Sequence, residues 1–144
     1  MKQLCFAFAL IFAPLSVAAQ EEAFTTFNAS EITEEQFLWI ARPIVVFADT
    51  EADPRFAQQL ALLEAQYDEL LERDVIIITD TDPSEPSALR EQLRPRGFAM
   101  ILMAKDGTVI LRKPFPWNVR EISRTIDKQP LRQFEIEDRR GNAD

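Results

Sequence analysis

The sequence predicts one α/β domain with the order β-α-β-α-β-β-α, an N-terminal leader helix and a mixed four-stranded sheet. Three observations support this fold class. Short β-branched apolar runs alternate with stretches of helical periodicity, which is typical of parallel strands joined by helices. An Asp-Gly pair separates the last two apolar runs and favours an antiparallel hairpin. The 144 residues, 47% of them hydrophobic, suffice for one domain with a sizeable core.

Residues 1–19 have the features of a cleaved signal peptide. Lys2 is followed by an apolar run over residues 4–13 and then by small residues up to Ala19. The apolar run is too short to cross a bilayer, which argues against an uncleaved anchor. We expect cleavage after Ala19, with Ala18 as the alternative. The product would be periplasmic or secreted and would have no stable membrane anchor.

Loss of the signal peptide would leave a chain without cysteine. Cys5 is the only cysteine, and the sequence contains no histidine. The processed chain would therefore have no cysteine nucleophile, no Ser-His-Asp triad and no metal site made of Cys or His ligands. Removal of Lys2 changes the formal charge from −8 to −9, and an acidic protein repels nucleic acid. We expect no nucleic-acid partner, no cofactor and no enzymatic activity.

Three segments surround or make up the domain. Residues 20–36 are expected to form a flexible leader and a short helix, because Thr33 and Gln36 have the spacing of a capping box. The domain itself is expected over residues 37–136. The tail over residues 137–144 has almost no apolar side chains, so we expect it to be disordered.

The first half of the domain is expected to contain two strands and a long helix. Residues 44–48 are apolar at every position, which is typical of a strand buried on both faces. Asp53 can cap a helix whose first residue is Pro54, and we expect this helix to extend to about Arg73. Residues 75–79 form the second apolar strand. The apolar stripe of the helix consists of Phe56, Leu60, Leu63, Tyr67 and Leu70.

The second half is expected to contain a helix, a hairpin and a last helix. Ser87 can cap a short helix over residues 88–93. Apolar strands over 99–104 and 108–112 are joined by the turn Lys105-Asp106-Gly107, because Asp-Gly supplies the positive φ angles of a tight turn. The last helix follows the cap-like residue Asn118.

The turn after the first strand resembles the active-site corner of thioredoxins. Thioredoxins have Cys-Gly-Pro-Cys before a long helix, and here Ala52-Asp53-Pro54-Arg55 occupies that place, so only the proline is retained. Ala99 occupies the position of a proline that is cis in thioredoxins. A cis bond before a residue other than proline costs about 3 kcal/mol, so we expect a trans bond before Ala99.

The stretch from Trp39 to Glu135 is similar to DUF4174, a thioredoxin-like family of unknown function. That family occurs in small exported bacterial proteins and as modules of animal extracellular-matrix proteins. The resemblance implies a thioredoxin-like fold and an exported location, and it brings no established activity, cofactor or catalytic residue. The similar motifs are Arg42-Pro43-Ile44-Val45-Val46-Phe47-Ala48, Asp53-Pro54-Arg55 through Leu63, Glu72-Arg73-Asp74, Lys105-Asp106-Gly107 and Pro130-Leu131-Arg132-Gln133-Phe134-Glu135.

The corner carries three candidate partner-binding residues, Asp49, Asp53 and Arg55. The alternation of Asp49, Glu51 and Asp53 is like that of a calcium loop, but the Gly at the sixth position and the Glu at the twelfth are missing. Loose divalent binding stays open, and helix capping by Asp53 is favoured. Arg55 could pair with Asp49 or Asp53 or hold an anionic ligand, and the surrounding acids favour an ion pair.

Two further groups are candidates. Asp80 and Asp82 are a carboxylate pair, but their Pro- and Ser-rich loop favours a solvated turn. Phe98, Phe115 and Trp117 could anchor a partner, with core packing as the alternative.

These observations predict a redox-inactive binding or structural module. Its partner would be a protein or small ligand of the envelope or the extracellular space, held at the corner or at the edge formed by Phe115 and Trp117. The alternative is an enzyme that uses carboxylates and Arg55, together with a divalent metal.

Overall fold

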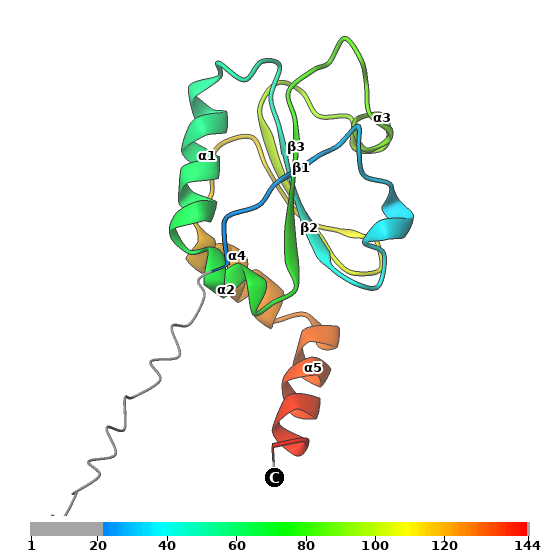
Figure 1. Ribbon diagram of the computed structural model, residues 1–144, viewed down its shortest axis with the longest axis vertical. Coiled ribbons are helices and arrows are strands. Elements are labelled where there is room, and N and C mark those ends of the chain that lie inside the picture. Colours follow the sequence, from blue (N-terminus) through cyan, green and yellow to red (C-terminus); the bar gives the residue numbers. More distant parts are fainter. Residues whose placement is uncertain (1–21, 144) are drawn as a thin grey trace, which may run out of the picture.

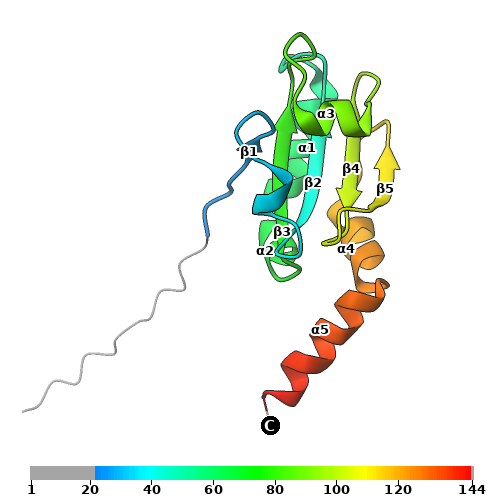
Figure 2. The same ribbon diagram turned by 90° about the vertical axis from the view of Figure 1, so that its right-hand side faces the viewer.

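The computed structural model describes residues 22–143, and the predicted signal peptide with its cleavage site at Ala19 lies outside them. Within these residues, helices cover both faces of a five-stranded sheet with the order β1-β3-β2-β4-β5 (Figures 1 and 2). β1, β3 and β2 are parallel, while β4 runs antiparallel to β2 and β5 antiparallel to β4. From β2 onwards, this mixed α/β arrangement agrees with the element order predicted for a thioredoxin-like fold. The strands are β1 (Phe27–Asn28), β2 (Arg42–Phe47), β3 (Val75–Asp80), β4 (Ala99–Met103) and β5 (Val109–Lys113).

The described sheet has one strand more than the four predicted. The additional strand, β1, lies in the segment 20–36 and pairs with the outer edge of β3 through two residues. Two residues are too few to give an alternating pattern, so only the presence of β3 beside them defines the strand. The predicted leader helix is also shorter than expected, since it is the 3-10 turn η1 (Glu34–Gln36). The Gln36 side chain accepts the Thr33 N–H at 2.7 Å, as in the predicted capping box.

Apart from α5, which extends beyond one end of the sheet, the helices form two groups, one on each face (Figures 1 and 2). One face carries α1, α2 and α4, and the other carries α3 and η1. Side chains of Asp53, Ser87 and Asn118 cap α1, α3 and α4, as predicted. The helices are α1 (Pro54–Ala65), α2 (Tyr67–Leu71), α3 (Ala88–Leu93), α4 (Val119–Asp127) and α5 (Pro130–Gly141). None of the helices in this part of the chain is long and apolar enough to cross a membrane.

The long helix predicted up to Arg73 is divided into α1 and α2. The division falls at Gln66, whose backbone angles (φ −132°, ψ 38°) are not helical. α1 packs on β2, whereas α2 packs on β3 and α4. The division therefore lets one apolar stripe follow two different strands.

α5 enters the tail for which the sequence predicts disorder. The helix continues to Gly141, and Arg139 in its last turn donates to the Glu72 carbonyl at 3.1 Å. Its one buried side chain is that of Arg132. Polar contacts hold this helix to the domain, which is why a search for apolar side chains does not find it.

The strand at the centre of the sheet has the burial that its apolar sequence predicts. Every residue of β2 is buried. Ile44 and Val46 pack under α1 and α4, and Val45 and Phe47 pack under α3. None of the peptide bonds described is cis, so the bond before Ala99 is trans, as predicted.

Gly107 in the hairpin turn provides a test of the packing at the other end of the sheet. Its φ is +86°, and an added Cβ would lie 2.9 Å from Glu34 Oε1 and 3.3 Å from Leu38 Cδ1. We expect Gly107→Ala to lower the free energy of unfolding by about 2 kcal/mol in urea titrations, because backbone strain and crowding add together. The control is Gly97→Ala, where φ is +62° and no atom lies within 4 Å of the new Cβ. An equal loss at both positions would contradict a contribution from crowding.

Candidate functional site

The predicted corner lies at the end of the sheet where β2 and β3 finish and β4 begins. Phe47 is paired with Asp80 on one side and with Ala99 on the other. We call this region, with the loops that leave it, the corner end. Ligands of open α/β sheets bind beyond the carboxyl ends of the parallel strands, so this is the first place to look for a site.

Asp53 and Arg55 form an ion pair across the first turn of α1. Asp53 Oδ1 accepts the backbone N–H of Arg55 at 2.9 Å and its Nε at 3.0 Å, and Oδ2 lies 2.7 Å from Nη2. The side-chain hydrogen bond from Arg55 lowers the pKa of Asp53, and the same bond raises the pKa of Arg55. Two predictions are confirmed for Asp53: it caps α1, and it forms an ion pair with Arg55. Asp49 is exposed beside this pair.

Phe98 is a core residue and contributes no exposed surface. Its side chain is 1% exposed, and the Arg55 guanidinium lies 5.5 Å from the centre of its ring. Of the two alternatives for Phe98, core packing is the one that the structure supports. The buried ring instead offers its face to the Arg55 guanidinium.

The prediction of a solvated turn is wrong for Asp80. Asp80 is buried, and its Oδ1 accepts Arg90 Nη2 at 2.8 Å and Nε at 3.1 Å. Its Oδ2 accepts the Ser87 hydroxyl at 2.6 Å. Arg90, which is also buried, donates to the Ala48 carbonyl at 3.0 Å. A carboxylate at the end of a strand can be buried when α3 brings an arginine to it, and the loop composition gives no sign of that partner.

Asp82 lies in solvent, as predicted. It is exposed and accepts hydrogen bonds from the backbone and the hydroxyl of Ser84. The hydroxyl of Ser84 lowers the pKa of the Asp82 carboxyl. Because Asp80 and Asp82 have separate partners, the structure does not support their use as an acid–base pair.

Phe115 and Trp117 form a stiff edge after β5. Their ring centres are 5.7 Å apart, and Lys113 Nζ lies 4.1 Å from the centre of the Trp117 ring. The buried Gln59 side chain donates to the Trp117 carbonyl at 3.0 Å and accepts its N–H at 2.8 Å. Phe115 is 48% exposed, whereas Trp117 is partly buried. This edge is therefore held in place by the core and presents Phe115 to solvent.

A pocket of about 390 Å³ adjoins the corner, and sequence reasoning did not find it. Its walls combine an apolar floor, in which Pro114 is exposed and Leu93, Phe98 and Ala99 are buried, with three exposed arginines. Within residues 22–143 these arginines form no ion pair with a carboxylate. The lining residues are Leu93, Arg94, Arg96, Phe98, Ala99, Arg112 and Pro114. We call this space the arginine pocket.

The arginine pocket depends on a backbone conformation that cannot be predicted from short sequence motifs. Arg94 ends α3 in the left-handed region with φ 48°, and Gly97 follows with φ 62°. These two residues turn the chain from α3 into β4, and Arg112 joins them from the neighbouring strand β5. The sequence Arg94-Pro95-Arg96-Gly97 was the available signal, but Arg112 lies too far along the chain for a local motif.

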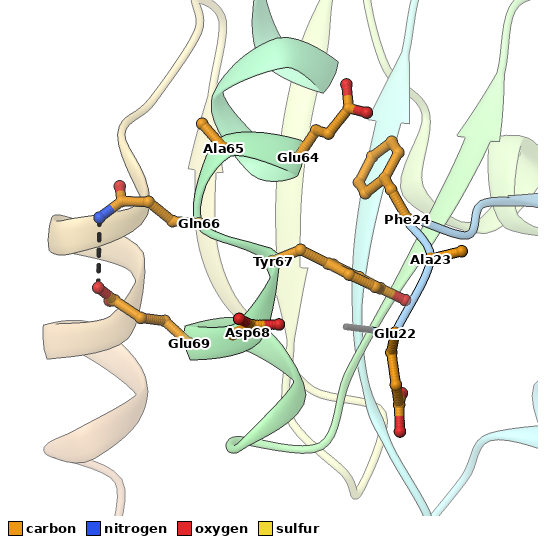
Figure 3. Close-up of a pocket in the computed structure, with 9 residues that line it drawn as sticks. All are labelled: Glu22, Ala23, Phe24, Glu64, Ala65, Gln66, Tyr67, Asp68 and Glu69. Atoms are coloured by element: carbon orange, nitrogen blue, oxygen red, sulfur yellow. Dashed lines mark hydrogen bonds between the residues drawn. The ribbon is translucent and has the colours of Figure 1, made fainter. Parts of the chain in front are cut away.

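A second pocket, of about 550 Å³, lies away from the corner end and is lined by Glu22, Ala23, Phe24, Glu64, Ala65, Gln66, Tyr67, Asp68 and Glu69. Figure 3 shows Tyr67 reaching from the start of α2 towards the segment at Ala23. The rings of Phe24 and Tyr67 meet edge to face at 5.2 Å, and Gln66 donates to Glu69 at 3.3 Å. In residues 22–143 no group of three or more Asp or Glu side chains is arranged to hold a metal ion. We assign no ligand to this cavity.

At the opposite end of the sheet, polar residues of the family-like motifs meet in one network of ion pairs. Glu135 Oε1 lies 2.9 Å from Arg42 Nη2 and 2.8 Å from Lys105 Nζ, which also contacts Asp74 at 2.8 Å. The other members are Arg73, Asp127 and Arg132. We call these seven residues the basal network. It joins α5 to the sheet and has an architectural role.

The family described as "Domain of unknown function (DUF4174)" matches residues 34–135. No curated protein matches the chain. Two solved Plasmodium yoelii structures are similar: Prx1a, modified at the N-terminus, which forms an artifactual octamer, and thioredoxin peroxidase I. Both are 17% identical with a TM-score of 0.47, and they cover 67% of this chain and 77% and 76% of their own chains, respectively.

Proposed function

Since the chain belongs to DUF4174, a family of unknown function, we propose that it is an exported, redox-inactive, thioredoxin-like binding module whose ligand occupies the corner end. A shared fold does not carry the thiol chemistry of thioredoxins with it, because function depends on the site. The single observation that carries the proposal is that Ala52 and Arg55 stand in the place of the thioredoxin cysteines, with the Arg55 guanidinium held by Asp53.

The residue inventory supports the redox part of the proposal. Disulfide exchange and thiol peroxidation both need a thiolate. The only cysteine, Cys5, precedes the corner by more than forty positions and lies in the proposed signal peptide. After cleavage, no residue of the chain could form the mixed disulfide or the sulfenic acid that such reactions require.

The rigidity of the corner end supports the binding part of the proposal. Arg90 ties α3 to the ends of β2 and β3, and Gln59 holds the Trp117 backbone. A surface whose side chains are already fixed loses little conformational entropy on binding. The alternative of an enzyme built on carboxylates and Arg55 is less well supported, because Asp53 and Arg55 already satisfy each other.

We expect residues 20–144 to show no turnover in two assays: reduction of insulin in the presence of dithiothreitol, and consumption of hydrogen peroxide with a thiol donor. The physical reason is the missing thiolate. A protein-free blank gives the background, and a thioredoxin and a peroxiredoxin serve as positive controls. Turnover above the blank would defeat the proposal.

The exported location has its own measurement. The full chain should be expressed in a Gram-negative host, and the product isolated from the envelope fraction should be weighed by mass spectrometry. The proposal expects a product that begins after Ala19, with Cys5 removed. An intact chain that retains Cys5 would contradict it.

A further inference from the structure

Building on the binding function proposed above, we infer that the ligand is an acidic, extended peptide segment of a partner protein. The segment pairs with the open edge of β5 and places a carboxylate side chain among Arg94, Arg96 and Arg112. Three features of the corner end lead to this inference: the charge of the pocket, its position beside an edge strand, and the nature of its floor.

The charge of the arginine pocket sets the sign of the ligand. The protein has a formal charge of −8, and yet three arginines surround one cavity. The one bond of these side chains that competes with a ligand runs from Arg112 Nη2 to the Leu93 carbonyl, at 2.8 Å. Guanidinium groups bind carboxylates through paired, charge-assisted hydrogen bonds, so a carboxylate is the matching group.

The position of the pocket favours a peptide over a free small acid. In the described sheet β5 lies at one end of the strand order, next to β4 alone, and Figure 2 shows it at the margin of the sheet. Arg112 belongs to β5, opposite Ile101 of β4, and Pro114 follows the strand directly. A peptide that adds to β5 through main-chain hydrogen bonds would therefore pass the pocket as it leaves the strand.

The floor of the pocket favours a carboxylate on a hydrocarbon stem. Among the apolar lining residues, Pro114 is exposed and supplies apolar surface beside the arginines, over the buried Leu93 and Phe98. A Glu side chain can lay its methylenes on this surface while its carboxylate meets the guanidinium groups. A second copy of this chain would bring Arg112 and Lys113 of its own β5 to the same edge, so charge complementarity favours an acidic partner over self-association.

Fluorescence polarisation with residues 20–144 and a labelled short peptide of alternating Glu and Thr tests the inference. We expect saturable binding that weakens as salt is raised, and no comparable binding of the matched peptide of alternating Gln and Thr. Arg96→Gln and Arg112→Gln should each weaken binding about tenfold. The matched control is Arg120→Gln, which removes the same charge from an exposed position of α4 and should change affinity by less than about twofold.

Two further measurements separate the parts of the inference. Citrate and inorganic phosphate compete as free anions, and each should displace the peptide only at concentrations far above the peptide Kd. Peptide addition should slow hydrogen exchange of the β5 amides from Val109 to Leu111, because strand pairing protects them. Circular dichroism checks that each variant is folded. Arg112→Gln also removes the hydrogen bond from Arg112 to the Leu93 carbonyl and could loosen the loop, so Arg96→Gln provides a second test that leaves this bond in place.

Each contrary result overturns the inference. Equal binding of the Gln peptide would show that the protein does not recognise a carboxylate. Equal effects of Arg112→Gln and Arg120→Gln would show that the peptide does not bind in the arginine pocket. Displacement of the peptide by citrate at a concentration near the peptide Kd would contradict an extended peptide ligand. Unchanged hydrogen exchange of the β5 amides would contradict strand pairing. Absence of peptide binding together with absence of redox turnover would overturn this inference and leave the proposed binding function in place. Redox turnover would defeat that function whatever the peptide does.

Discussion

Replacing Glu135 with Gln is expected to lower the free energy of unfolding by about 3 kcal/mol near pH 7. One oxygen of Glu135 meets both Arg42 and Lys105, at 2.9 and 2.8 Å, and the Arg42 side chain is 1% exposed. Glutamine keeps the shape of the side chain and removes the charge. The variant would leave the buried Arg42 guanidinium without the negative charge of Glu135, and its bond to the Arg73 carbonyl does not replace that charge. Urea unfolding of the two proteins measures the difference.

The same carboxylate predicts a loss of stability in acid. Burial alone would raise the pKa of the Glu135 carboxyl, but hydrogen bonds from Arg42 and Lys105 and the charges of both lower it from 4.5 to about 2. A folded pKa below the unfolded one means that the stabilisation is fully present above about pH 4.5 and is lost as pH falls towards 2. The difference between the wild type and Glu135→Gln should therefore shrink between about pH 4.5 and pH 2.

The control for this prediction is Glu137→Gln in the same helix. Glu137 is exposed, and the substitution changes the net charge by the same amount. We expect it to leave the unfolding midpoint nearly unchanged at both ends of the pH range. If Glu135→Gln and Glu137→Gln behave alike, the basal network does not hold α5 to the domain.

The sequence predicted those parts of the fold that local chemistry determines. The apolar run of β2, the Asp-Gly turn and the caps Asp53, Ser87 and Asn118 each depend on neighbouring residues, and all of them are present. β1 and α5 were missed for a different reason. β1 exists only because β3 offers an edge, and α5 is held by ion pairs and not by an apolar stripe.

The basal network also depends on contacts between distant segments, which local patterns do not predict. Six of its seven members lie in family-like motifs that are separate in the sequence and Asp127 lies in none, while Glu135 is 93 positions from Arg42 and 30 from Lys105. Nothing in any one motif indicates that the motifs meet. The charged residues of the motifs therefore support the family resemblance, but the motifs do not predict that these residues form ion pairs with one another.

The position of the corner was predicted from the sequence, and the arginine pocket beside it was not. The corner was found because a strand, an acidic turn and Pro54 lie in sequence, and the pair of Asp53 and Arg55 was found because the two are neighbours. For Phe98 the sequence left partner anchoring and core packing open, because whether a single aromatic beside a glycine faces solvent depends on the helices around it, and the structure supports core packing. The arginine pocket was missed because α3, β4 and β5 each supply a part of it.

Asp80→Asn is expected to lower the free energy of unfolding by about 3 kcal/mol, measured by urea titration near pH 7. The side chains of Asp80 and Arg90 are 6% and 9% exposed, so asparagine would leave a buried guanidinium without a counter-charge. The hydrogen bond from Arg90 to the Ala48 carbonyl remains, but it does not replace the charge. Asp82→Asn, in the exposed loop beside it, should leave the unfolding midpoint nearly unchanged.

A double-mutant cycle separates the ion pair from the other bonds of its members. Asp80→Ala and Arg90→Ala should each cost about 3 kcal/mol, and the double variant should cost at least about 2 kcal/mol less than their sum, because the second substitution no longer leaves a buried charge unpaired. Additive losses would show that the pair contributes no coupling. Because Arg90 also joins α3 to the end of β2, a strong coupling would mean that this buried pair fixes the loop that carries Arg94 and Arg96.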